Sequence, residues 1–281
     1  MADATVGVLH PGDMGAALGS VLRKAGTVVL WVSSGRSAAT VRRAETADLR
    51  DVGSVDELSR RSDMIVSVCP PHAAAEVARS VSGFKGTFVD VNAVSPATAR
   101  AVAAEIETGG GRYVDGGIVG PPPRSRRTTR LYLSGPSAQD VAGLFASTVV
   151  DVRVVSDRLG AASALKMSYA AWTKGTAALL LAIRALARAE DVEAALLEEW
   201  DTSLPGVQEQ SLRAAHSACS KGWRWVGEMQ EIASTFGSVD LPDGFHHAAA
   251  EIFRRAPRLD DAHADEPTLE QVLVALTGQG A

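Results

Sequence analysis

The sequence predicts an α/β N-terminal domain followed by an all-α C-terminal domain. Over the first half of the chain, short runs rich in β-branched residues alternate with helical runs, which is typical of a mostly parallel sheet with helices on both faces. From Leu159 onward the apolar spacing is helical and no strand pattern occurs. We therefore expect a boundary near Asp157, with domains over residues 1–157 and 158–281.

The expected strands are short and bounded by turn residues. They cover residues 5–9, 27–32, 64–69, 87–91, 112–115, 131–134 and 150–155. Helix signals lie between them: Gly26 suits a helix C-terminus, Ser54 and Glu57 form a capping box, and Ser95 and Ser137 suit N-caps. The main helices are expected over residues 15–25, 97–107, 138–148, 161–189, 192–200, 207–220, 223–236, 244–255 and 269–276, with an acidic stretch at 260–266.

The composition excludes several classes of protein. Hydrophobic residues make up 46% of the chain and charged residues 22%, which indicates a globular rather than a disordered protein. The net charge of -5 provides no positive field to hold nucleic acid or an anionic membrane. The most apolar stretch, residues 176–187, contains Arg184 and is too short to span a bilayer.

Cysteine content and the first residues bear on the compartment. Cys69 and Cys219 are too few for a disulfide framework, which favours a reducing compartment. The chain also begins without the basic region of a signal peptide and runs directly into a strand pattern. We therefore expect a cytoplasmic protein.

A turn containing two glycines follows the first expected strand. A dinucleotide-binding fold needs a tight turn here, a residue without a Cβ beside the pyrophosphate, and a glycine where the helix packs on the strand. Gly12 and Gly15 supply the last two, whereas His10 stands in place of the usual first glycine. The position of the turn favours a Rossmann-type nucleotide site over a plain strand-to-helix turn. The expected cofactor-binding residues here are Pro11, Gly12, Asp13, Met14 and Gly15.

The end of the second expected strand indicates which cofactor binds. NAD sites usually place a carboxylate about 20 residues after the glycine turn, for the ribose 2′-hydroxyl. Residues 33–37 read Ser-Ser-Gly-Arg-Ser instead, and hydroxyls with an arginine suit a 2′-phosphate. NADP(H) is therefore favoured over NAD(H), with Ser33, Ser34 and Arg36 as its ligands. Arg42 and Arg43 are better explained as a solvated helix face.

Four segments together resemble the β-hydroxyacid dehydrogenase superfamily, which includes 6-phosphogluconate dehydrogenase-like proteins and the imine reductases. Residues 10–15 are similar to the family's G-L-G-x-M-G turn, and residues 68–71 (VCPP) to the loop beside the nicotinamide ribose. Residues 90–96 (DVNAVSP) resemble the D-x-S-T-x-x-P segment, and residues 160–166 (GAASALK) the G-x-G-x-x-x-K motif that opens the long inter-domain helix.

This likeness spans at least residues 5–190, and its nearest counterpart is a poorly characterised NADP-binding branch near the imine reductases. It implies that the helical halves of two subunits intertwine into a homodimer, which the long apolar helix 161–189 also favours. It implies further cofactor contacts from Cys69, Pro70, Asn92 and Ala93. From its surroundings in the sequence, Cys69 is better explained as a small filler than as a nucleophile.

Lys166 is the predicted catalytic residue. It lies on an otherwise apolar face of the long helix, where desolvation would bring its pKa toward neutrality; the alternative is a lysine that only covers the helix end. The resemblance implies general acid/base catalysis by this lysine, although imine reductases place another residue there. Tyr169 and Thr173 share its helix face. Tyr169 could donate a proton or orient the lysine, where dehydrogenases usually carry asparagines.

The expected substrate loop departs from the hydroxyacid dehydrogenases. They hold a carboxylate on a loop written D-x-P-V-S-G-G, whereas residues 115–123 read DGGIVGPPP, and three prolines have no N–H to donate. This pattern looks like the imine reductases and favours a less acidic substrate near Gly117, Ile118, Val119 and Thr173. The arginine-rich residues 124–130 could bind an anionic substrate group, although a solvated loop is the favoured explanation.

Aromatic and histidine side chains of the second half carry weaker signals. Trp223, Trp225 and Met229 lie at helical spacing, which ordinary helix packing explains better than a role in a partner's site. His246 and His247 have no second ligand pair, so no metal site is predicted.

Together these patterns predict an NADPH-dependent oxidoreductase. It would transfer hydride between nicotinamide and a small carbonyl, imine or hydroxy compound. Two alternatives stay open: a 3-hydroxyacid dehydrogenase proper, and a regulatory protein that binds NADPH without turnover.

Overall fold

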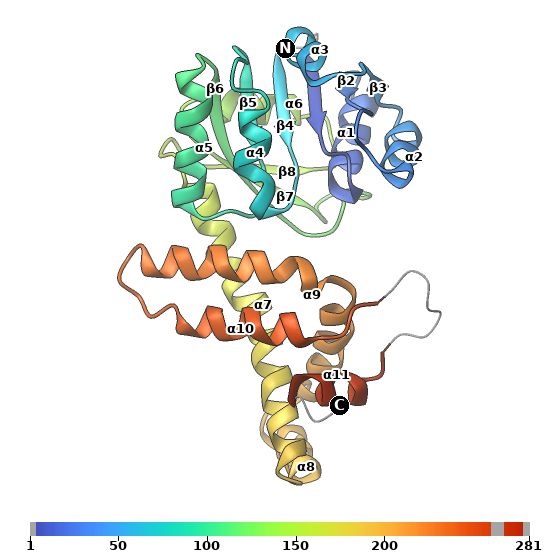
Figure 1. The fold of residues 1–281 in the computed structure, drawn as a ribbon, viewed down its shortest axis with the longest axis vertical. Coiled ribbons are helices and arrows are strands. Elements are labelled where there is room, and N and C mark those ends of the chain that lie inside the picture. The colour runs from blue at the N-terminus through green and yellow to red at the C-terminus, as the bar shows by residue number, and fades with distance from the viewer. Residues whose placement is uncertain (1–3, 260–266, 278–281) are drawn as a thin grey trace. The chain divides into compact units, whose positions relative to one another are not determined.

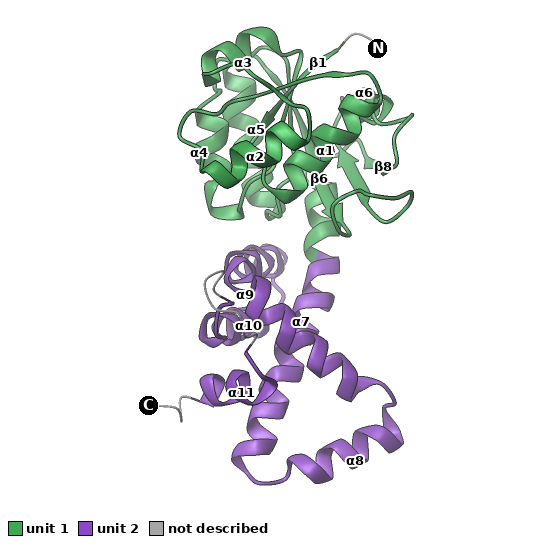
Figure 2. Ribbon diagram, turned by 90° about the vertical axis from the view of Figure 1, so that its right-hand side faces the viewer, with its two compact units in different colours: residues 1–167 green, residues 168–281 purple. Residues whose placement is uncertain are grey.

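The computed structural model describes residues 4–259 and 267–277 (Figure 1). The acidic stretch at residues 260–266 lies outside the described residues. The chain divides into two compact units, Met1–Met167 and Ser168–Ala281 (Figure 2). The first unit thus extends ten residues beyond the expected boundary at residue 157, and the assignment of cofactor and substrate domains stays a prediction.

One sheet forms the centre of the first unit. Its strands are β1 (Thr5–Leu9), β2 (Val28–Trp31), β3 (Arg50–Asp51), β4 (Met64–Ser67), β5 (Thr87–Asp90), β6 (Arg112–Val119), β7 (Arg130–Ser134) and β8 (Asp151–Ser156). Their order is β3-β2-β1-β4-β5-β6-β7-β8, with every neighbouring pair parallel except β6 and β7. The first six strands have the order of a doubly wound dinucleotide-binding sheet, so the predicted fold class is confirmed.

Two predictions about the strands need correction. The two-residue strand β3 was not expected, because Arg50 and Asp51 are exposed and show no apolar pattern. Strand β6 continues four residues past the predicted end at Asp115, because Gly116 to Val119 pair with β7. Gly117, Ile118 and Val119, which were expected in the substrate loop, therefore lie in a buried strand.

Helices cover both faces of the sheet, as the alternating pattern predicts. They are α1 (Asp13–Lys24), α2 (Ala38–Thr46), α3 (Val55–Arg61), α4 (Ala74–Arg79), α5 (Pro96–Thr108) and α6 (Ala138–Leu144), with a short 3₁₀ turn at Pro71–Ala73. Helices α1, α2 and α6 contribute to one apolar core, and α3, α4 and α5 to the other. Figure 1 shows α4 and α5 side by side in front of the sheet.

Most of the predicted helix ends are confirmed. The Ser54 and Ser95 hydroxyls accept hydrogen bonds from the backbone N–H groups of Glu57 and Thr98. Gly26 has a left-handed φ of 94°, and its N–H bonds to the C=O of Arg23, as expected at a helix C-terminus. Ser137 occupies the predicted N-cap position of α6, but its side chain makes no capping hydrogen bond.

The second unit is helical. It contains most of α7 (Ala161–Ala189), together with α8 (Glu193–Ser203), α9 (Val207–Gly237), α10 (Gly244–Arg255) and α11 (Leu269–Thr277). The prediction of two helices over residues 207–236 was wrong, because α9 continues through Gly222. A Cβ on that glycine would lie 3.6 Å from the Phe253 carbonyl oxygen, an ordinary van der Waals contact.

Arg184, which interrupts the apolar pattern of α7, is buried but paired. Its guanidinium donates to Glu193 at 2.6 Å and to the Ser211 hydroxyl at 2.9 Å, which ties α7 to α8 and α9. This pairing satisfies a charge that would be costly to bury alone. Among residues 4–259 and 267–277, no helix is long and apolar enough to cross a membrane.

Candidate functional site

The turn between β1 and α1 has the geometry of a nucleotide-binding turn. The N–H of Gly12 bonds to the His10 carbonyl at 2.8 Å, and α1 begins at Asp13. A Cβ on Gly15 would lie 2.7 Å from that same carbonyl oxygen, so only glycine fits where the helix meets the strand. His10 closes the turn with a left-handed φ of 65°, although it is not a glycine.

Gly12 differs from Gly15 in what surrounds it. A Cβ on Gly12 would meet no atom of the protein within 4 Å, and its φ of -67° suits any residue. The open space lies at the N-terminus of α1, where backbone N–H groups and the helix dipole favour an anion. The turn therefore fits the pyrophosphate of a dinucleotide, which would need close approach to the backbone at this point.

The other residues predicted at this turn have separate surroundings. Pro11 is buried, Met14 packs against the apolar core of α1, and Asp13 is exposed. The Asp13 carboxylate pairs with the Arg43 guanidinium at 2.7 Å, so Arg43 does more than form a solvated face.

The loop after β2 forms a tight turn beside the glycine turn. The Arg36 N–H bonds to the Ser33 carbonyl at 3.0 Å, and Gly35 takes a φ of 72°. Ser34 is exposed, and the Ser37 hydroxyl caps α2.

A carboxylate reaches this loop from a strand that sequence reasoning missed. Asp51, at the end of β3, accepts hydrogen bonds from the N–H groups of Ser33 at 3.1 Å and Gly53 at 2.9 Å. Burial opposes the ionised form, but these bonds outweigh it and lower the pKa of Asp51. The expectation that no carboxylate stands near the end of β2 is therefore wrong. Only the pairing of β2 with β3 creates this proximity.

His10 and Arg36 each bury a polar atom that has no hydrogen-bond partner, Nδ1 of the imidazole and Nε of the guanidinium. Burial and then the charge of Arg36 lower the pKa of His10 to about 4. Burial likewise lowers the pKa of Arg36, while its charge also acts on the thiol of Cys69. These side chains therefore lie together, although they come from three separate loops.

The loop after β4 is fixed by the amide of Asn92. This amide accepts the N–H of Cys69 at 2.5 Å and donates to the Ser67 hydroxyl at 3.0 Å. Because both ends of the amide are used, Asn92 positions the loop that carries Pro70. Burial raises the pKa of the Cys69 thiol to about 12, so it is no nucleophile at neutral pH.

Asp90 supports the same loop from inside the sheet. Its carboxylate accepts the N–H of Asn92 at 2.9 Å and the Tyr113 hydroxyl at 3.3 Å. Burial raises the pKa of Asp90 to about 7, and the charge of the nearby Asp115 adds to the rise. The hydrogen bond from the Asn92 N–H lowers this pKa but does not outweigh burial. Ala93, which follows Asn92, is half-buried.

Lys166 lies against strand β6, within the first unit. Its Nζ donates to the Ile118 carbonyl oxygen at 2.7 Å. Gly117 makes this approach possible, since a Cβ there would lie 2.9 Å from the Lys166 Cβ and 3.1 Å from the Ala162 carbonyl oxygen. The structure thus brings the predicted catalytic lysine to the predicted substrate residues, 48 positions away in the chain.

A buried network fixes the start of α7 and hence Lys166. The Asp115 carboxylate accepts the Ser163 hydroxyl at 2.5 Å, the Ser163 N–H at 3.0 Å and the Ser134 hydroxyl at 2.7 Å. The Ser134 oxygen in turn accepts the N–H of Ala162 at 3.0 Å. Two N–H groups of the first helical turn are thereby satisfied by the sheet. Sequence reasoning missed this network, because serines of a helix and a strand carry no local signal of contact.

Tyr169 and Thr173 follow on the part of α7 that belongs to the second unit. Tyr169 is 47% exposed and is therefore not a core tyrosine. The Thr173 hydroxyl donates to the Tyr169 carbonyl at 3.2 Å, within its own helix. Val119 is buried in β6.

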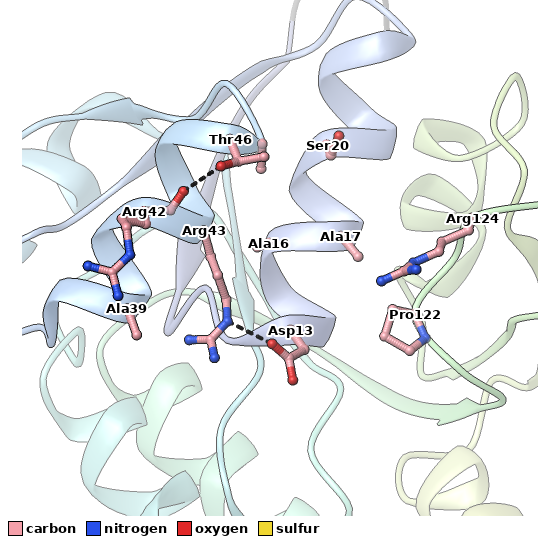
Figure 3. A pocket seen from close by; sticks show the side chains of 11 residues that line it. Asp13, Ala16, Ala17, Ser20, Ala39, Arg42, Arg43, Thr46, Pro122 and Arg124 are labelled. Carbon is pink, nitrogen blue, oxygen red and sulfur yellow. Dashed lines mark hydrogen bonds and ion pairs between the residues drawn. The ribbon is translucent and has the colours of Figure 1, made fainter. Parts of the chain in front are cut away.

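One hollow of the first unit lies along α1, and Lys166 is not among the residues that line it. It measures about 520 Å³ and is lined by α1, α2, Pro122 and Arg124. Figure 3 shows Arg42 and Arg43 on one side of it and Arg124 on the other. Arg124, Arg126 and Arg127 are exposed, and Thr129 anchors their loop through a 2.6 Å hydrogen bond to the Pro121 carbonyl.

The aromatic residues of α9 mainly serve packing. Met229 is buried, and Trp225 packs edge-on against Phe253 at 5.0 Å between ring centroids. The guanidinium groups of Arg224 and Arg258 lie 5.0 and 4.5 Å from the centroid of the Trp223 ring. The interpretation as helix packing is thus confirmed for Met229 and Trp225.

Two family matches cover most of the chain. Residues 5–144 match the NAD binding domain of 6-phosphogluconate dehydrogenase. Residues 187–256 match a domain of unknown function, DUF1932. A curated relative, an uncharacterized 28.5 kDa protein of Methanothermus fervidus, is 31% identical over 154 residues, which are 54% of this chain and 59% of the relative. The match therefore spans less than two thirds of that relative's length.

Solved structures resemble nearly the whole chain. A conserved protein of unknown function, described as structurally similar to 3-hydroxyacid dehydrogenases, is 27% identical, with a TM-score of 0.68 over 89% of this chain and 96% of its own. The 3-hydroxyisobutyrate dehydrogenase of Mycobacterium tuberculosis is 16% identical, with a TM-score of 0.71 over 99% of each chain. An imine reductase from Myxococcus stipitatus, solved with NAD⁺, is 20% identical, with a TM-score of 0.56 over 89% of this chain and 92% of its own.

The sheet order and the glycine turn define a dinucleotide-binding α/β protein. The matches narrow this class: the chain belongs to the β-hydroxyacid dehydrogenase-like superfamily, and residues 5–144 match the NAD binding domain of 6-phosphogluconate dehydrogenase. The family and its structural neighbours are oxidoreductases, and these matches support a nicotinamide cofactor.

Proposed function

We propose that the protein is an NADPH-dependent oxidoreductase that reduces a small carbonyl or imine compound, or oxidises the corresponding hydroxy compound or amine. The observation that carries this proposal is the Lys166 ammonium group held at the Ile118 carbonyl, 2.7 Å away. Strands β1 and β6 are three intervals apart in one sheet, which at about 4.8 Å per interval is about 14 Å. An extended dinucleotide can cover that span from the glycine turn toward Lys166, at the carboxyl edge where such sheets bind ligands.

Lys166 is proposed as the general acid. When bound, the nicotinamide would supply the hydride that reaches the substrate carbon. Lys166 would give a proton from Nζ to the carbonyl oxygen or imine nitrogen as charge develops there. The Ile118 carbonyl orients Nζ, and the Asp115 network holds the helix turn that carries it. In the oxidative direction, the neutral amine would accept the proton.

The substrate is proposed to be less acidic than a hydroxyacid. Gly117, Ile118 and Val119 are strand residues paired with β7, so they do not form the flexible carboxylate loop of a dehydrogenase. The N–H and C=O of one strand residue point to the same side, so the Ile118 N–H would face the Lys166 edge and could bind a substrate oxygen. Tyr169 and Thr173, further along α7, are proposed to contact the rest of the substrate.

NADP(H) is proposed as the cofactor because the loop after β2 carries Arg36, whose charge reaches His10 of the glycine turn, and an exposed Ser34. Asp51 is the observation that favours NAD(H) as a second candidate, since its carboxylate adjoins the end of β2. Its Oδ1 already accepts two backbone N–H groups, which favours a structural role for this oxygen. Fluorescence titration with NADPH and NADH distinguishes the two candidates.

A homodimer is proposed through α7. Trp172, Leu179 and Leu186 are 72%, 44% and 63% exposed, and they repeat every seven residues along one face. A seven-residue apolar repeat is typical of helices that pack against another helix. Light scattering should give a dimer for the wild type and a monomer for Trp172→Lys. A monomeric wild type would contradict the proposal.

Cys69 and Cys219 are unbridged, in keeping with the cytoplasm as the proposed compartment.

The deciding experiment is a substrate screen on protein whose NADPH affinity is known. NADPH oxidation would be followed with cyclic imines, ketones and β-ketoacids, and NADP⁺ reduction with β-hydroxyacids. Turnover of imines or ketones supports the proposal. Turnover of β-hydroxyacids alone would identify a 3-hydroxyacid dehydrogenase instead. Tight NADPH binding without any turnover would identify a regulatory protein.

A further inference from the structure

We propose that His10 is a further cofactor-binding residue, which together with Arg36 holds the 2′-phosphate of NADP(H). This role rests on the proposed function, since it presupposes a dinucleotide bound at the glycine turn. Four features of the two side chains support it: the backbone conformation of His10, the unpartnered nitrogens, the proximity of the two groups and the loop that carries Arg36.

The backbone at His10 favours glycine, yet the chain carries a large side chain there. With a φ of 65°, this residue is in the left-handed region, where a Cβ is strained. A strained residue at a ligand-binding turn points to a use for its side chain. Gly15 and Gly12 occupy the two other special positions of the same turn, so only the first position has exchanged its glycine for an imidazole.

Two polar nitrogens of this pair are buried without a partner. They are His10 Nδ1 and Arg36 Nε, and His246 and Ser62 contribute the only other such buried side-chain atoms among the described residues. Leaving buried polar groups unpaired is unfavourable, and these two belong to loops that follow neighbouring parallel strands, β1 and β2. A ligand oxygen that accepts hydrogen bonds from both side chains, after small rotations, would satisfy them together.

The two side chains are close enough to influence each other's charge. Burial, and then the Arg36 charge, hold the pKa of His10 at about 4, so the imidazole is neutral at physiological pH. A neutral imidazole presents one N–H donor and one acceptor nitrogen. An anion placed between the two groups would accept from the guanidinium and from the imidazole N–H, and it would offset the positive charge that now disfavours His10 protonation.

The origin of Arg36 identifies which phosphate would be held. Arg36 belongs to the loop after β2, and this loop faces the adenosine ribose in doubly wound sheets. The pyrophosphate lies instead at Gly12 and the start of α1. Of the other arginines near α1, Arg43 is paired with Asp13, and Arg42 is exposed on α2. Arg42→Ala is therefore a matched control that removes a charge from the same neighbourhood.

The test is the dissociation constant of NADPH and NADH, measured by fluorescence titration for wild type, His10→Gly, Arg36→Ala and Arg42→Ala. His10→Gly restores the residue that this backbone favours, so the fold is retained. We expect His10→Gly to weaken NADPH binding about tenfold, because one charge-assisted hydrogen bond to the 2′-phosphate is lost. NADH has no 2′-phosphate, so its binding should weaken less than about twofold. Arg36→Ala should weaken NADPH more strongly, and Arg42→Ala should change neither constant.

Competition with two nucleotide fragments distinguishes a contact to the 2′-phosphate from a contact to the 5′-phosphate. Adenosine 2′,5′-bisphosphate should lose affinity for His10→Gly, whereas adenosine 5′-monophosphate should not. Equal losses for both fragments would place His10 at the 5′-phosphate and overturn the assignment. Unchanged NADPH affinity in His10→Gly, with normal wild-type binding, would overturn the role of His10 and leave the proposed function standing. Failure of the wild type to bind either nucleotide would overturn the proposed function itself.

A second variant guards against an effect of the backbone alone. His10→Asn tolerates the left-handed conformation and keeps a short polar side chain. If the imidazole binds the phosphate, His10→Asn should weaken NADPH binding as His10→Gly does, with a thermal unfolding midpoint close to that of the wild type. If NADPH binding follows the unfolding midpoint across the variants instead, the role of His10 is overturned.

Discussion

The glycine turn and the β6–α7 contact use glycine for opposite purposes. At Gly12 a Cβ would meet no protein atom within 4 Å, so the missing side chain leaves space for something outside the protein. At Gly117 a Cβ would lie 2.9 Å from Lys166, so the missing side chain is filled by the protein itself. A glycine in a motif can therefore either leave space for a ligand or allow a catalytic side chain to pack close to the backbone. The atoms around the glycine distinguish these two roles.

Removal of the Lys166 ammonium group should have the largest effect. Lys166→Ala is expected to lower turnover by about 10²- to 10⁴-fold, because the proton donor is lost. The NADPH dissociation constant should stay within about twofold, since the glycine turn is untouched. Stopped-flow rates with the best substrate of the screen, together with NADPH titration, measure both. An equal loss of NADPH binding and turnover would show that Lys166 does not act separately from the glycine turn.

Asp90 lies between the two regions and makes stability depend on pH. Its folded-state pKa of about 7 exceeds the unfolded value, so the folded state binds an extra proton between pH 4 and 7. Stability of the wild type relative to Asp90→Asn should therefore fall as pH rises through this window, by up to about 4 kcal/mol, and level off above pH 7. Urea unfolding of both proteins from pH 4 to 8 checks the sign. A flat difference would contradict it.

The two glycines can be exchanged for alanine as a direct contrast. Gly117→Ala should cost about 1–3 kcal/mol of unfolding free energy, because Lys166 and Ala162 must move away. Turnover should fall with it. Gly12→Ala should leave stability within about 0.5 kcal/mol, since its φ suits alanine, and should weaken NADPH binding instead. Denaturant unfolding and NADPH titration on both variants test the contrast, and a stable Gly117→Ala with full activity would break it.

Weakening the hydrogen bonds between α7 and the sheet should have the smallest effect. Ser163→Ala removes one hydrogen bond to Asp115, while the backbone N–H of residue 163 still reaches that carboxylate. We expect a loss of about 1 kcal/mol in unfolding free energy and a modest fall in turnover. Ser234→Ala, at an exposed position of α9, provides the control. A Ser163 variant as stable and active as this control would show that the network does not position Lys166.

Much of the fold could be predicted from local pattern. The helix over residues 161–189 and the strand over residues 5–9 have the predicted bounds, because their apolar periodicity is long or their neighbours are clear turn residues. The exposed strand β3 and the continuous helix α9 were missed. Strand β3 forms by pairing of Arg50 and Asp51 with β2, and α9 continues through Gly222, which lies beside Phe253 of α10.

The doubly wound domain, the glycine turn and Lys166 as the candidate catalytic residue are encoded in local sequence patterns, since these depend on spacing within one segment. Only the assembled fold shows that Lys166 meets Ile118, that Asp51 meets Ser33, and that the charge of Arg36 reaches His10. Such contacts join residues distant in the chain, and their energies depend on burial and on the pairing of strands. No local pattern encodes those quantities, so the charges and distances of the site emerge only when the sheet is assembled.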